Sequence, residues 1–279
     1  MKNFENKVAA ITGAGSGMGR TLALDLARRG CHLALSDVNE AGLAETVQLV
    51  AAASPSVKVT SQRLDVADRA AMVAWADQVV ADHGKANLIF NNAGVGLGAT
   101  VSGMKIEDFE WLMNINFWGV VYGTQAFLPH LKAAGEGHVI NTSSLFGLLA
   151  VPSQSAYNAA KFAVRGFTES LRQELDMLDC GVSATSVHPG GIKTAIARNA
   201  RMDSSVRAIG MDEQTSSRKF EKNFITTAEK AAAIILRAVE RDQRRVLVGP
   251  DAVLLDKVVR LFPSAYQRFT TYFARKQMS

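Results

Sequence analysis

The stretch Lys7-Val-Ala-Ala-Ile-Thr-Gly-Ala-Gly-Ser-Gly-Met-Gly19 decides the fold of this chain. Its first part, Lys7–Thr12, has the apolar character of a short buried strand, and a helical pattern follows from Thr21 to Arg29. The glycines therefore stand where a strand turns tightly into the N-terminus of a helix. Small residues let a pyrophosphate approach the backbone, and free N–H groups and the helix dipole favour its charge. The stretch predicts a dinucleotide site, with a ligand-free glycine turn as the alternative.

The second predicted strand, Cys31–Asp37, ends in an acid that indicates which dinucleotide is bound. Asp37 stands 24 positions after Gly13, close to the expected place of the adenosine ribose. A carboxylate there can accept hydrogen bonds from the ribose hydroxyls and would repel the 2′-phosphate of NADP. NAD is therefore the expected cofactor. The structural alternative is that Asp37 only caps the next helix, which starts near Asn39.

Basic residues near this position bear on the choice between NAD and NADP. Neither Ser16 nor Val38 provides a cation for an additional phosphate. Arg20 and the pair Arg28-Arg29 lie farther along the chain and keep NADP as the less favoured cofactor.

Tyr157 and Lys161 stand four residues apart in a helical stretch, which places a phenol and an ammonium on the same face. An ammonium about 4 Å from the phenol favours the phenolate by about 4 kcal/mol at an effective dielectric of roughly 20. Lys161 is thus expected to lower the pKa of Tyr157 and make it a general acid or base for a carbonyl or an alcohol. Alone, the spacing also fits an exposed aromatic beside a solvated amine.

In order and spacing, the motifs resemble those of the short-chain dehydrogenases/reductases over roughly the first 250 residues. The segments behind the resemblance are Thr12-Gly13-x-x-x-Gly17-x-Gly19, Asp65-Val66, Asn91-Asn92-Ala93-Gly94, Asn116, Ser144, Tyr157-x-x-x-Lys161, and Pro189-Gly190 with Ile192 and Thr194. One departure is Asn87, where the family commonly carries Asp, and it touches no expected chemistry.

The resemblance implies a role for each of these residues. Tyr157 would be the acid-base residue, with Lys161 holding the nicotinamide ribose and Ser144 steadying the reacting oxygen. Asn116 would anchor a water that links Lys161 to solvent. The implied cofactor contacts are Gly13, Ser16, Gly17, Met18, Gly19, Asp37, Asp65, Val66, Asn92, Ala93, Gly94, Tyr157, Lys161, Pro189, Gly190, Ile192 and Thr194.

Each motif residue also has a structural interpretation. Ser144 could end a strand, Asn116 could bend a helix, and Pro189-Gly190 could be an ordinary turn. Their joint occurrence favours the catalytic interpretation. For Asp65, which could cap a helix near Asp68, and for Asn91, which could join neighbouring strands, the structural roles stay open.

The chain has 279 residues, of which 48% are hydrophobic and 20% charged, as expected for one large core. Strand-like runs alternate with helical ones, which predicts an α/β fold: a Rossmann-type, doubly wound, parallel seven-stranded sheet with helices on both faces. The predicted strands are 7–12, 31–37, 57–64, 86–91, 138–142, 182–188 and 245–248. Residues 1–250 would form one domain and residues 251–279 a helical extension.

Apolar residues after the serine indicate the substrate class. The residues expected to contact the substrate are Ser144, Leu145, Phe146, Val151 and Tyr157. Aliphatic walls suit a steroid-like, terpenoid, long-chain or aromatic alcohol better than a free sugar. Segment 195–224 occupies the place of the family's substrate-covering loop, and its arginines offer an anionic substrate group as an alternative. Those arginines include Arg198, Arg201, Arg207 and Arg218.

Residues 251–279 have apolar positions at helical spacing and are expected to form two amphipathic helices. Packing on the same domain or on a partner subunit is the favoured interpretation. Arg268, Arg275 and Lys276 lie among aromatic residues, so peripheral membrane contact is the alternative.

Composition narrows the remaining classes. Cys31 and Cys180 suit a reducing compartment without a disulfide, and the five histidines lack metal-ligand spacing. A net charge of +5 without a basic patch argues against nucleic acid, and no apolar run is long enough to span a membrane. A cytoplasmic location is expected. The family's assembly mode implies a homodimer or homotetramer through helices within 105–134 and 154–178.

Together these features predict NAD-dependent interconversion of a secondary alcohol and its ketone. The alternatives are an NADP-dependent carbonyl reductase and a non-catalytic dinucleotide-binding regulator. A sugar-nucleotide epimerase would require a differently spaced glycine turn and a larger C-terminal region.

Overall fold

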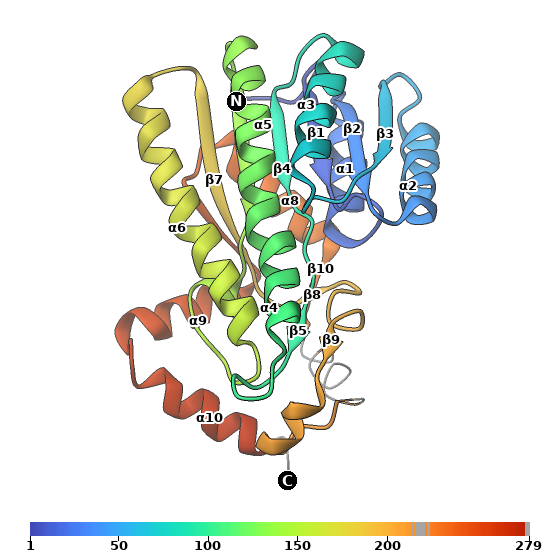
Figure 1. Cartoon of the computed structure of the whole chain (residues 1–279). Coiled ribbons are helices and arrows are strands. Elements are labelled where there is room, and N and C mark those ends of the chain that lie inside the picture. Colours follow the sequence, from blue (N-terminus) through green and yellow to red (C-terminus); the bar gives the residue numbers. More distant parts are fainter. Residues whose placement is uncertain (214, 216–220, 222–223, 277–279) are drawn as a thin grey trace.

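The computed structural model describes residues 1–213, 215, 221 and 224–276, and its centre is a sheet of seven parallel strands (Figure 1). The strand order is β11-β7-β6-β4-β1-β2-β3. The strands are β1 (Val8–Thr12), β2 (His32–Asp37), β3 (Val59–Arg63), β4 (Leu88–Asn91), β6 (Gly137–Thr142), β7 (Val182–Pro189) and β11 (Arg245–Val248). The predicted seven-stranded parallel sheet is confirmed, with strand ends within two residues of those expected.

Helices cover both faces of the sheet because its strands are apolar on both sides. In β1, Ala9 and Ile11 pack with helices α1 and α8, while Val8 and Ala10 pack with α3, α5 and α6. The helices are α1 (Gly17–Arg28), α2 (Glu40–Ala53), α3 (Arg69–His83), α4 (Ile106–Met113), α5 (Gly119–Ala133), α6 (Ser155–Leu178), α8 (Ala228–Glu240), α9 (Pro250–Leu261) and α10 (Tyr266–Lys276).

The strand order reverses between β1 and β4, because β2 and β3 lie on one side of β1 while β4 and β6 lie on the other. In doubly wound sheets the ligand crevice lies at such a point, beyond the carboxyl ends of the strands. The fold therefore places the functional site at the end of the sheet where β1, β4 and β6 terminate.

Short elements extend the molecule beyond these carboxyl ends, at the lower end of Figure 1. They are β5 (Leu97–Gly98) paired with β9 (Arg201–Met202), β8 (Ile192–Lys193) paired with β10 (Thr226–Thr227), and the 3₁₀ turns η2 (Leu145–Gly147) and η3 (Ser204–Ile209). Segment 195–224 thus contains β9 and η3, whereas the sequence predicted an irregular loop. Residues 214, 216–220 and 222–223 of this segment lie outside the described residues. Helices α9 and α10 lie at the same lower end.

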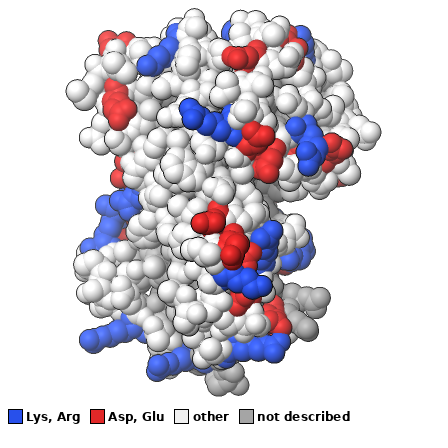
Figure 2. All heavy atoms as spheres, in the orientation of Figure 1, with Lys and Arg blue, Asp and Glu red and all other residues white. Residues whose placement is uncertain are grey.

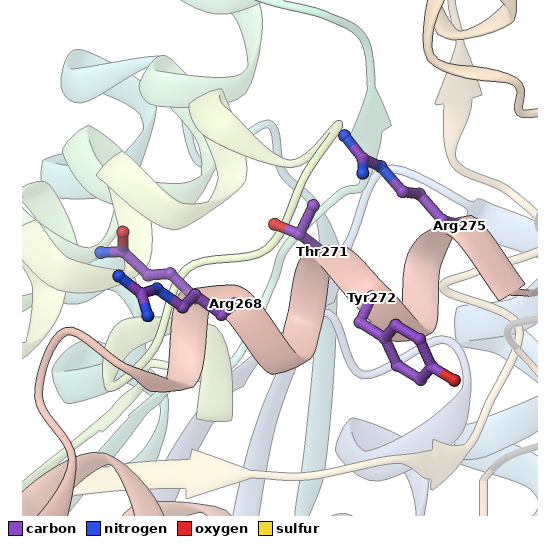
Figure 3. A pocket seen from close by; sticks show the side chains of 5 residues that line it. Arg268, Thr271, Tyr272 and Arg275 are labelled. Carbon is purple, nitrogen blue, oxygen red and sulfur yellow. The ribbon is translucent and has the colours of Figure 1, made fainter.

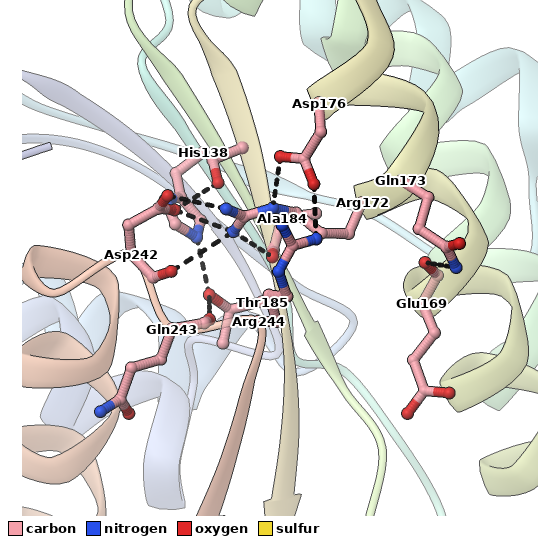
Figure 4. Close-up of polar contacts among 11 residues, drawn as sticks. His138, Glu169, Arg172, Gln173, Asp176, Ala184, Thr185, Asp242, Gln243 and Arg244 are labelled. Atoms are coloured by element: carbon pink, nitrogen blue, oxygen red, sulfur yellow. Dashed lines mark hydrogen bonds and ion pairs between the residues drawn. The ribbon is translucent and has the colours of Figure 1, made fainter.

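An ion-pair network joins α6 to β7 and to the turn after α8 (Figure 4). Arg172, mostly buried in α6, binds both carboxylate oxygens of Asp242, at 2.9 and 2.7 Å, and donates to Asp176 at 3.0 Å. It also donates to the carbonyl of Ala184 in β7 at 3.2 Å. Arg172 thus ties α6 to β7 and to the turn after α8. The network therefore fixes the position of α6, the helix that provides Tyr157 and Lys161.

Candidate active site

Two glycines of the turn after β1, Gly13 and Gly19, have no room for a side chain. Gly13 has a φ of +66°, and a Cβ there would lie 2.9 Å from the Cα of Ala93. A Cβ on Gly19 would lie 2.1 Å from the carbonyl oxygen of Gly13. Glycine is therefore required at both positions, one for its backbone conformation and both for close packing.

The N-terminus of α1 leaves its first N–H groups available to an anion. Ser16 is the N-cap residue, but its side chain makes no capping hydrogen bond, and the first turn, with Met18, holds no acid. A Cβ on Gly17 would lie 3.1 Å from Cγ2 of Thr194, so the structure brings Thr194 beside this turn, as the sequence predicted. An N-terminus of this kind fits a phosphate group, because unpaired donors and the helix dipole both favour negative charge.

Asp37 lies beside the same turn. Its Oδ2 accepts from the N–H of Gly15 at 2.8 Å, and its Oδ1 accepts from the N–H of Asn39 at 2.8 Å. Asn39 caps α2, since its side chain accepts from the N–H of Gly42 at 3.1 Å. The interpretation of Asp37 as the cap of this helix is therefore wrong.

Two of the three arginines that kept NADP open, Arg20 and Arg29, are held by other partners, while Arg28 is exposed. Arg20 donates to the carbonyl of Gly15 at 2.6 Å and to Glu45 at 2.7 Å. Arg29 pairs with Asp25 and Glu240 at the far end of α1. The guanidinium groups of Arg20 and Arg29 are therefore already engaged by groups of the protein.

The ends of β1 and β4 are tied together through Thr12. Its hydroxyl accepts from the N–H groups of Asn92 and Ala93, at 3.0 and 3.1 Å. The Asn92 amide donates back to the Thr12 carbonyl at 3.0 Å. Asn91 joins neighbouring strands by donating to Asn141 of β6 at 2.8 Å. The structural role that the sequence left open for Asn91 is therefore observed.

Asp65 and Val66 follow β3 on the route to α3. Asp68 caps α3 by accepting from the N–H of Ala71, so the interpretation of Asp65 as the cap is wrong. Asp65 instead accepts from the N–H of Ala67 at 2.9 Å. Val66 is buried, and a Cβ on Gly119 would lie 2.7 Å from its Cγ2.

Lys161 is buried in α6 with a defined partner. Its Nζ donates to the carbonyl of Thr142 at 2.9 Å and lies 5.6 Å from the centroid of the Tyr157 ring. A Cβ on Gly94 would lie 3.6 Å from Lys161 Nζ and 3.2 Å from Asn116 Oδ1. The structure therefore brings Gly94, Asn116, Tyr157 and Lys161 together.

Asn116 lies in a π-helical turn, Asn114–Trp118, between α4 and α5. Its side-chain amide accepts from the N–H of Val95 and donates to the carbonyl of Val95, both at 2.8 Å. Asn116 thus lies where the α-helical pattern changes to a π turn, and π turns are frequent at functional sites. Because both polar atoms of the amide bind Val95, this side chain holds the segment after β4 in place.

Ser144 ends the segment after β6 and caps η2, where its Oγ accepts from the N–H of Phe146 at 3.0 Å. The Ser144 side chain also lies near the Tyr157 hydroxyl and acts to lower the pKa of that phenol. His188, fully buried at the end of β7, donates from Nδ1 to the Ser144 carbonyl at 3.0 Å and accepts at Nε2 from Ser186 at 2.9 Å. A carbonyl can only accept, so this tautomer follows from the geometry. Sequence reasoning missed His188, although it directly precedes the Pro189-Gly190 motif.

The pKa values of the central pair differ from the prediction. Burial raises the pKa of the Tyr157 phenol, and the neighbouring Ser144 side chain opposes this only in part. Burial also lowers the pKa of Lys161 to about 8. The expected lowering of the Tyr157 pKa by Lys161 is therefore wrong for the protein alone, because the amine donates to Thr142 and the partial burial of the phenol disfavours its charged form.

The loop after Ser144 is held from two sides. Asn158 donates to the carbonyls of Phe146 and Leu149, at 2.8 and 2.9 Å, and accepts from the N–H of Val151 at 3.3 Å. The Phe146 ring meets the Tyr157 ring edge to face, with centroids 6.2 Å apart. Phe146 thus lies next to the phenol, as expected of a residue that contacts the substrate.

The C-terminal extension holds the same loop from outside. Tyr266 of α10 accepts from the N–H of Ala150 at 3.1 Å, and its ring packs with Leu145, Leu148 and Leu149. Leu145 therefore faces the C-terminal helices. Neither Asn158 nor Tyr266 was identified from the sequence, although Asn158 adjoins Tyr157.

The end of β7 joins the sheet to α9. Gly190 donates to the carbonyl of Val248, and a Cβ on Gly190 would lie 2.2 Å from Oδ2 of Asp251. Pro189 is the last residue of β7, and Ile192 is buried in the core beside α1. The segment Pro189–Thr194 thus crosses the site toward the glycine turn.

The described arginines of segment 195–224 already have partners. Arg198 pairs with Glu221 at 3.3 Å and Arg207 pairs with Glu213. Arg201 pairs with Asp108 at 2.8 Å and lies 3.5 Å above the Trp111 ring. Arg218 lies outside the described residues.

Comparison with known proteins agrees with this geometry. The family model for short chain dehydrogenases matches residues 7–205. This chain belongs to the short-chain dehydrogenase family. The match covers the glycine turn, the Asn-Asn-Ala-Gly segment, Ser144, Tyr157 and Lys161, and the chain is thus an oxidoreductase of the short-chain dehydrogenase type.

Individual relatives are similar over two thirds of this chain or more. The putative oxidoreductase SadH of Mycobacterium tuberculosis is 52% identical over 96% of this chain and 95% of its own length. A short-chain dehydrogenase/reductase from Burkholderia phymatum, with a crystal structure in complex with NAD, is 31% identical, covers 96% of this chain and 97% of its own, and has a TM-score of 0.87. Cyclohexanol dehydrogenase of Acinetobacter sp. (strain SE19) is 36% identical over 69% of this chain and 76% of its own length.

Proposed function

We propose that the protein is an NAD-dependent oxidoreductase that interconverts a secondary alcohol and its ketone. The observation behind this proposal is the convergence of Ser144, Tyr157 and Lys161 at the carboxyl ends of the strands. There the serine side chain lies near the Tyr157 phenol, and the buried amine of Lys161 lies 5.6 Å from the centroid of its ring. A non-catalytic regulator would have no need of this arrangement.

NAD fits the chain's own residues. The glycine turn leaves backbone without side chains, the N-terminus of α1 offers free donors, and Asp37 lies beside both. When bound, NAD supplies the hydride acceptor for alcohol oxidation, and its reduced form supplies the donor for ketone reduction. The Burkholderia phymatum relative was crystallised with NAD, which supports the same choice. NADP is disfavoured because Arg20 is already bound by Gly15 and Glu45.

The protein's own part in the reaction is proton transfer and orientation. In alcohol oxidation, Ser144 would hold the substrate oxygen while Tyr157 takes the hydroxyl proton as the C–H hydride leaves. In reduction the same phenol returns the proton to the ketone oxygen. Lys161, with its pKa lowered to about 8, stays mostly protonated at neutral pH and so provides positive charge beside the phenolate.

The substrate is proposed to be apolar or bulky. Phe146 lies edge to face with Tyr157, and Val151 packs in the cluster of Leu145 and Tyr266. One relative of this chain is a cyclohexanol dehydrogenase, which supports a cyclic secondary alcohol as a first candidate.

The organisation of the chain is proposed on the same basis. Residues 1–250 would be one dehydrogenase domain, and residues 251–279 would pack on it or on a partner subunit. A homodimer or homotetramer through α5 and α6 is proposed, because Trp118 and Phe162 are 43% and 41% exposed there. We further propose a cytoplasmic location. Of the helices in the described residues, none is both long and apolar enough to span a bilayer.

The test is an absorbance assay at the reduced-nicotinamide band, with NAD or NADP and a panel of cyclic and long-chain secondary alcohols. We expect turnover with NAD to exceed turnover with NADP. Tyr157→Phe should keep NAD binding, measured by fluorescence titration, and lose turnover by roughly 10²-fold or more. Binding of NAD without turnover on any alcohol or ketone would support the regulator instead.

A further inference from the structure

The C-terminal helices expose an unusual amount of apolar surface. Leu254 and Leu261 of α9 are 63% and 73% exposed, and Phe262, Phe269 and Tyr272 are between 54% and 61% exposed. Leu254 and Leu261 share one face of α9 by helical spacing, as Phe269 and Tyr272 do on α10. Contiguous apolar surface of this kind commonly marks an interaction site.

These side chains are exposed although both helices also pack against the dehydrogenase. On α9 the buried residues are Ala252 and Asp256, and among the described side chains of α10 the buried one is Tyr266. Tyr266 covers the loop after Ser144, whereas Leu254, Leu261, Phe269 and Tyr272 remain exposed. We call the exposed set, Leu254, Lys257, Leu261, Phe262, Arg268, Phe269, Tyr272 and Arg275, the outer surface.

The charged residues of the outer surface are all basic. From Lys257 to the end of the chain the sequence contains five basic residues and no Asp or Glu. Arg260 is neutralised by Asp256 at 2.8 Å, but Arg268 and Arg275 form no ion pair with any of the described residues. Figure 2 shows basic side chains along the lower end of the molecule, where Figure 1 places α10.

A hollow on α10 adds hydrogen-bond donors to this charge (Figure 3). It has a volume of about 450 Å³ and is lined by Gln267, Arg268, Thr271, Tyr272 and Arg275. Thr271 and Arg275, one helical turn apart, project from the same side of α10. Arg268 and Arg275 lie at the two ends of this hollow with Thr271 between them, and each guanidinium can donate to an oxygen of a phosphate group.

We propose that the outer surface docks the enzyme on a bilayer containing anionic phospholipid. The exposed aromatic and aliphatic side chains would enter the interface, while Arg268 and Arg275 bind lipid phosphates. A second copy of the chain fits this surface less well. A two-fold interface would bring two copies of the same basic surface together, and like charges brought close to each other are unfavourable.

The position of the outer surface gives such docking a consequence. It lies at the end of the molecule where the strands terminate, and Tyr266 contacts the loop that follows Ser144. A docked enzyme would therefore hold its substrate entrance close to the lipid, where an apolar alcohol concentrates. Docking itself requires no catalysis, so it is testable independently of the proposed reaction.

The test is sedimentation of the full-length protein with vesicles of phosphatidylcholine, with or without phosphatidylglycerol. We expect binding to anionic vesicles that is weakened by salt, and much weaker binding to neutral ones. Each cation near an anionic surface contributes about 1 kcal/mol, or roughly five-fold in affinity. The double variant Arg268→Glu/Arg275→Glu should thus bind at least about 25-fold more weakly, and Phe269→Ser should also weaken binding.

The matched control is Arg237→Glu/Arg241→Glu, which makes the same change of charge at exposed positions of α8 and the residue after it. It should bind vesicles nearly as the wild type does, as should Tyr157→Phe. Equal losses in the two charge variants would overturn the proposal, since net charge alone would explain them. The surface would instead be assigned to a second copy if the wild type did not bind vesicles and the Arg268/Arg275 variant differed from it in oligomeric state, as measured by light scattering. Binding of inorganic phosphate without binding of anionic vesicles would also overturn it.

Discussion

At the scale of single residues, His188 shows how a group outside the reaction can set its geometry. Its imidazole connects Ser186 to the carbonyl of Ser144, the residue proposed to hold the substrate oxygen. Burial lowers the pKa of His188 to about 4, so the ring is neutral and keeps one donor and one acceptor. We therefore regard His188 as a positioning residue.

Replacing His188 should affect stability and turnover together. His188→Leu removes one of the two hydrogen bonds to the Ser144 carbonyl, which also accepts from the N–H of Gly147 at 2.9 Å, and takes away the partner of the buried Ser186 hydroxyl. The expected cost is about 1–3 kcal/mol in the free energy of unfolding. The substitution should also lower kcat with little change in NAD affinity, because Ser144 shifts while the glycine turn does not. His188→Asn keeps a donor near the position of Nδ1 and should recover part of kcat. A leucine variant with normal kcat would show that Ser144 is held without His188.

Two buried histidines should make the protein sensitive to acid. Burial lowers the pKa of His138 to about 3 and that of His188 to about 4, both below the ordinary value of 6.5. His138 faces Thr185, with Asp242 and Arg172 close by (Figure 4). Below pH 6.5 these two histidines bind protons in the unfolded chain but not in the folded one. The free energy of unfolding therefore keeps their whole contribution above pH 6.5 and loses it as the pH falls toward 4.

Each of the two histidines should contribute a slope of about 1.4 kcal/mol per pH unit within this window. Urea unfolding at several pH values between 6.5 and 4.5 measures the slope. His138→Gln keeps a polar group for Thr185 but does not titrate, and should remove about half of the contribution of the pair. An unchanged slope in this variant would mean that His138 is protonated in the folded protein.

At the scale of elements, the sequence predicted the strands well because most of them are short, largely apolar runs followed by a turn or cap signal; β3, with Val59 as its one apolar residue, is the exception. The π turn at Asn116 was not predicted, since no local pattern distinguishes it from the ordinary helix on either side. It exists because the amide of Asn116 reaches Val95, a contact between α4–α5 and the segment after β4. Contacts of this kind are made by tertiary packing, which residue spacing within one helix does not encode.

Gly123 and Gly166 both lie in helices, but the first is crowded and the second is not, so replacing each by alanine gives a matched test of packing. In α5, a Cβ on Gly123 would lie 2.1 Å from Oδ1 of Asn91, which is held in the Asn91–Asn141 contact. In α6, a Cβ on Gly166 would meet nothing within 4 Å. Gly123→Ala should therefore destabilise the protein by about 1–3 kcal/mol through overpacking. Gly166→Ala should stabilise it by about 0.5–1 kcal/mol, because alanine loses less backbone entropy in a helix.

Urea unfolding of the two glycine variants measures both changes in the free energy of unfolding. One dependence of that free energy on urea concentration is used for the wild type and both variants. The prediction is that the two substitutions change the free energy of unfolding in opposite directions. If Gly123→Ala were as stable as the wild type, the buried contact of Asn91 with Asn141 would have to tolerate displacement.

At the scale of the whole molecule, the site was predictable where motif residues lie close to the strand ends. Asp37, Asn92 and Lys161 all lie where the strand order places them. The C-terminal extension was predictable only as two amphipathic helices. Its contact with the loop after Ser144 joins Ala150 to Tyr266, which stand 116 residues apart, and a helical pattern does not tell which distant surface its apolar face covers.

Tyr266 therefore gives the most direct test of how the extension supports the site. Its hydroxyl accepts from Ala150, and its ring covers Leu145, Leu148 and Leu149. Tyr266→Phe keeps the ring and should cost about 1 kcal/mol in stability, while raising KM for a bulky alcohol a few-fold at nearly normal kcat. Tyr266→Ala also removes the packing and should cost about 3 kcal/mol or more, with a larger rise in KM. NAD affinity should not change in either variant, because the glycine turn lies elsewhere in the site. Steady-state kinetics and urea unfolding measure the series, and equal KM values in all three proteins would show that the loop keeps its shape without the extension.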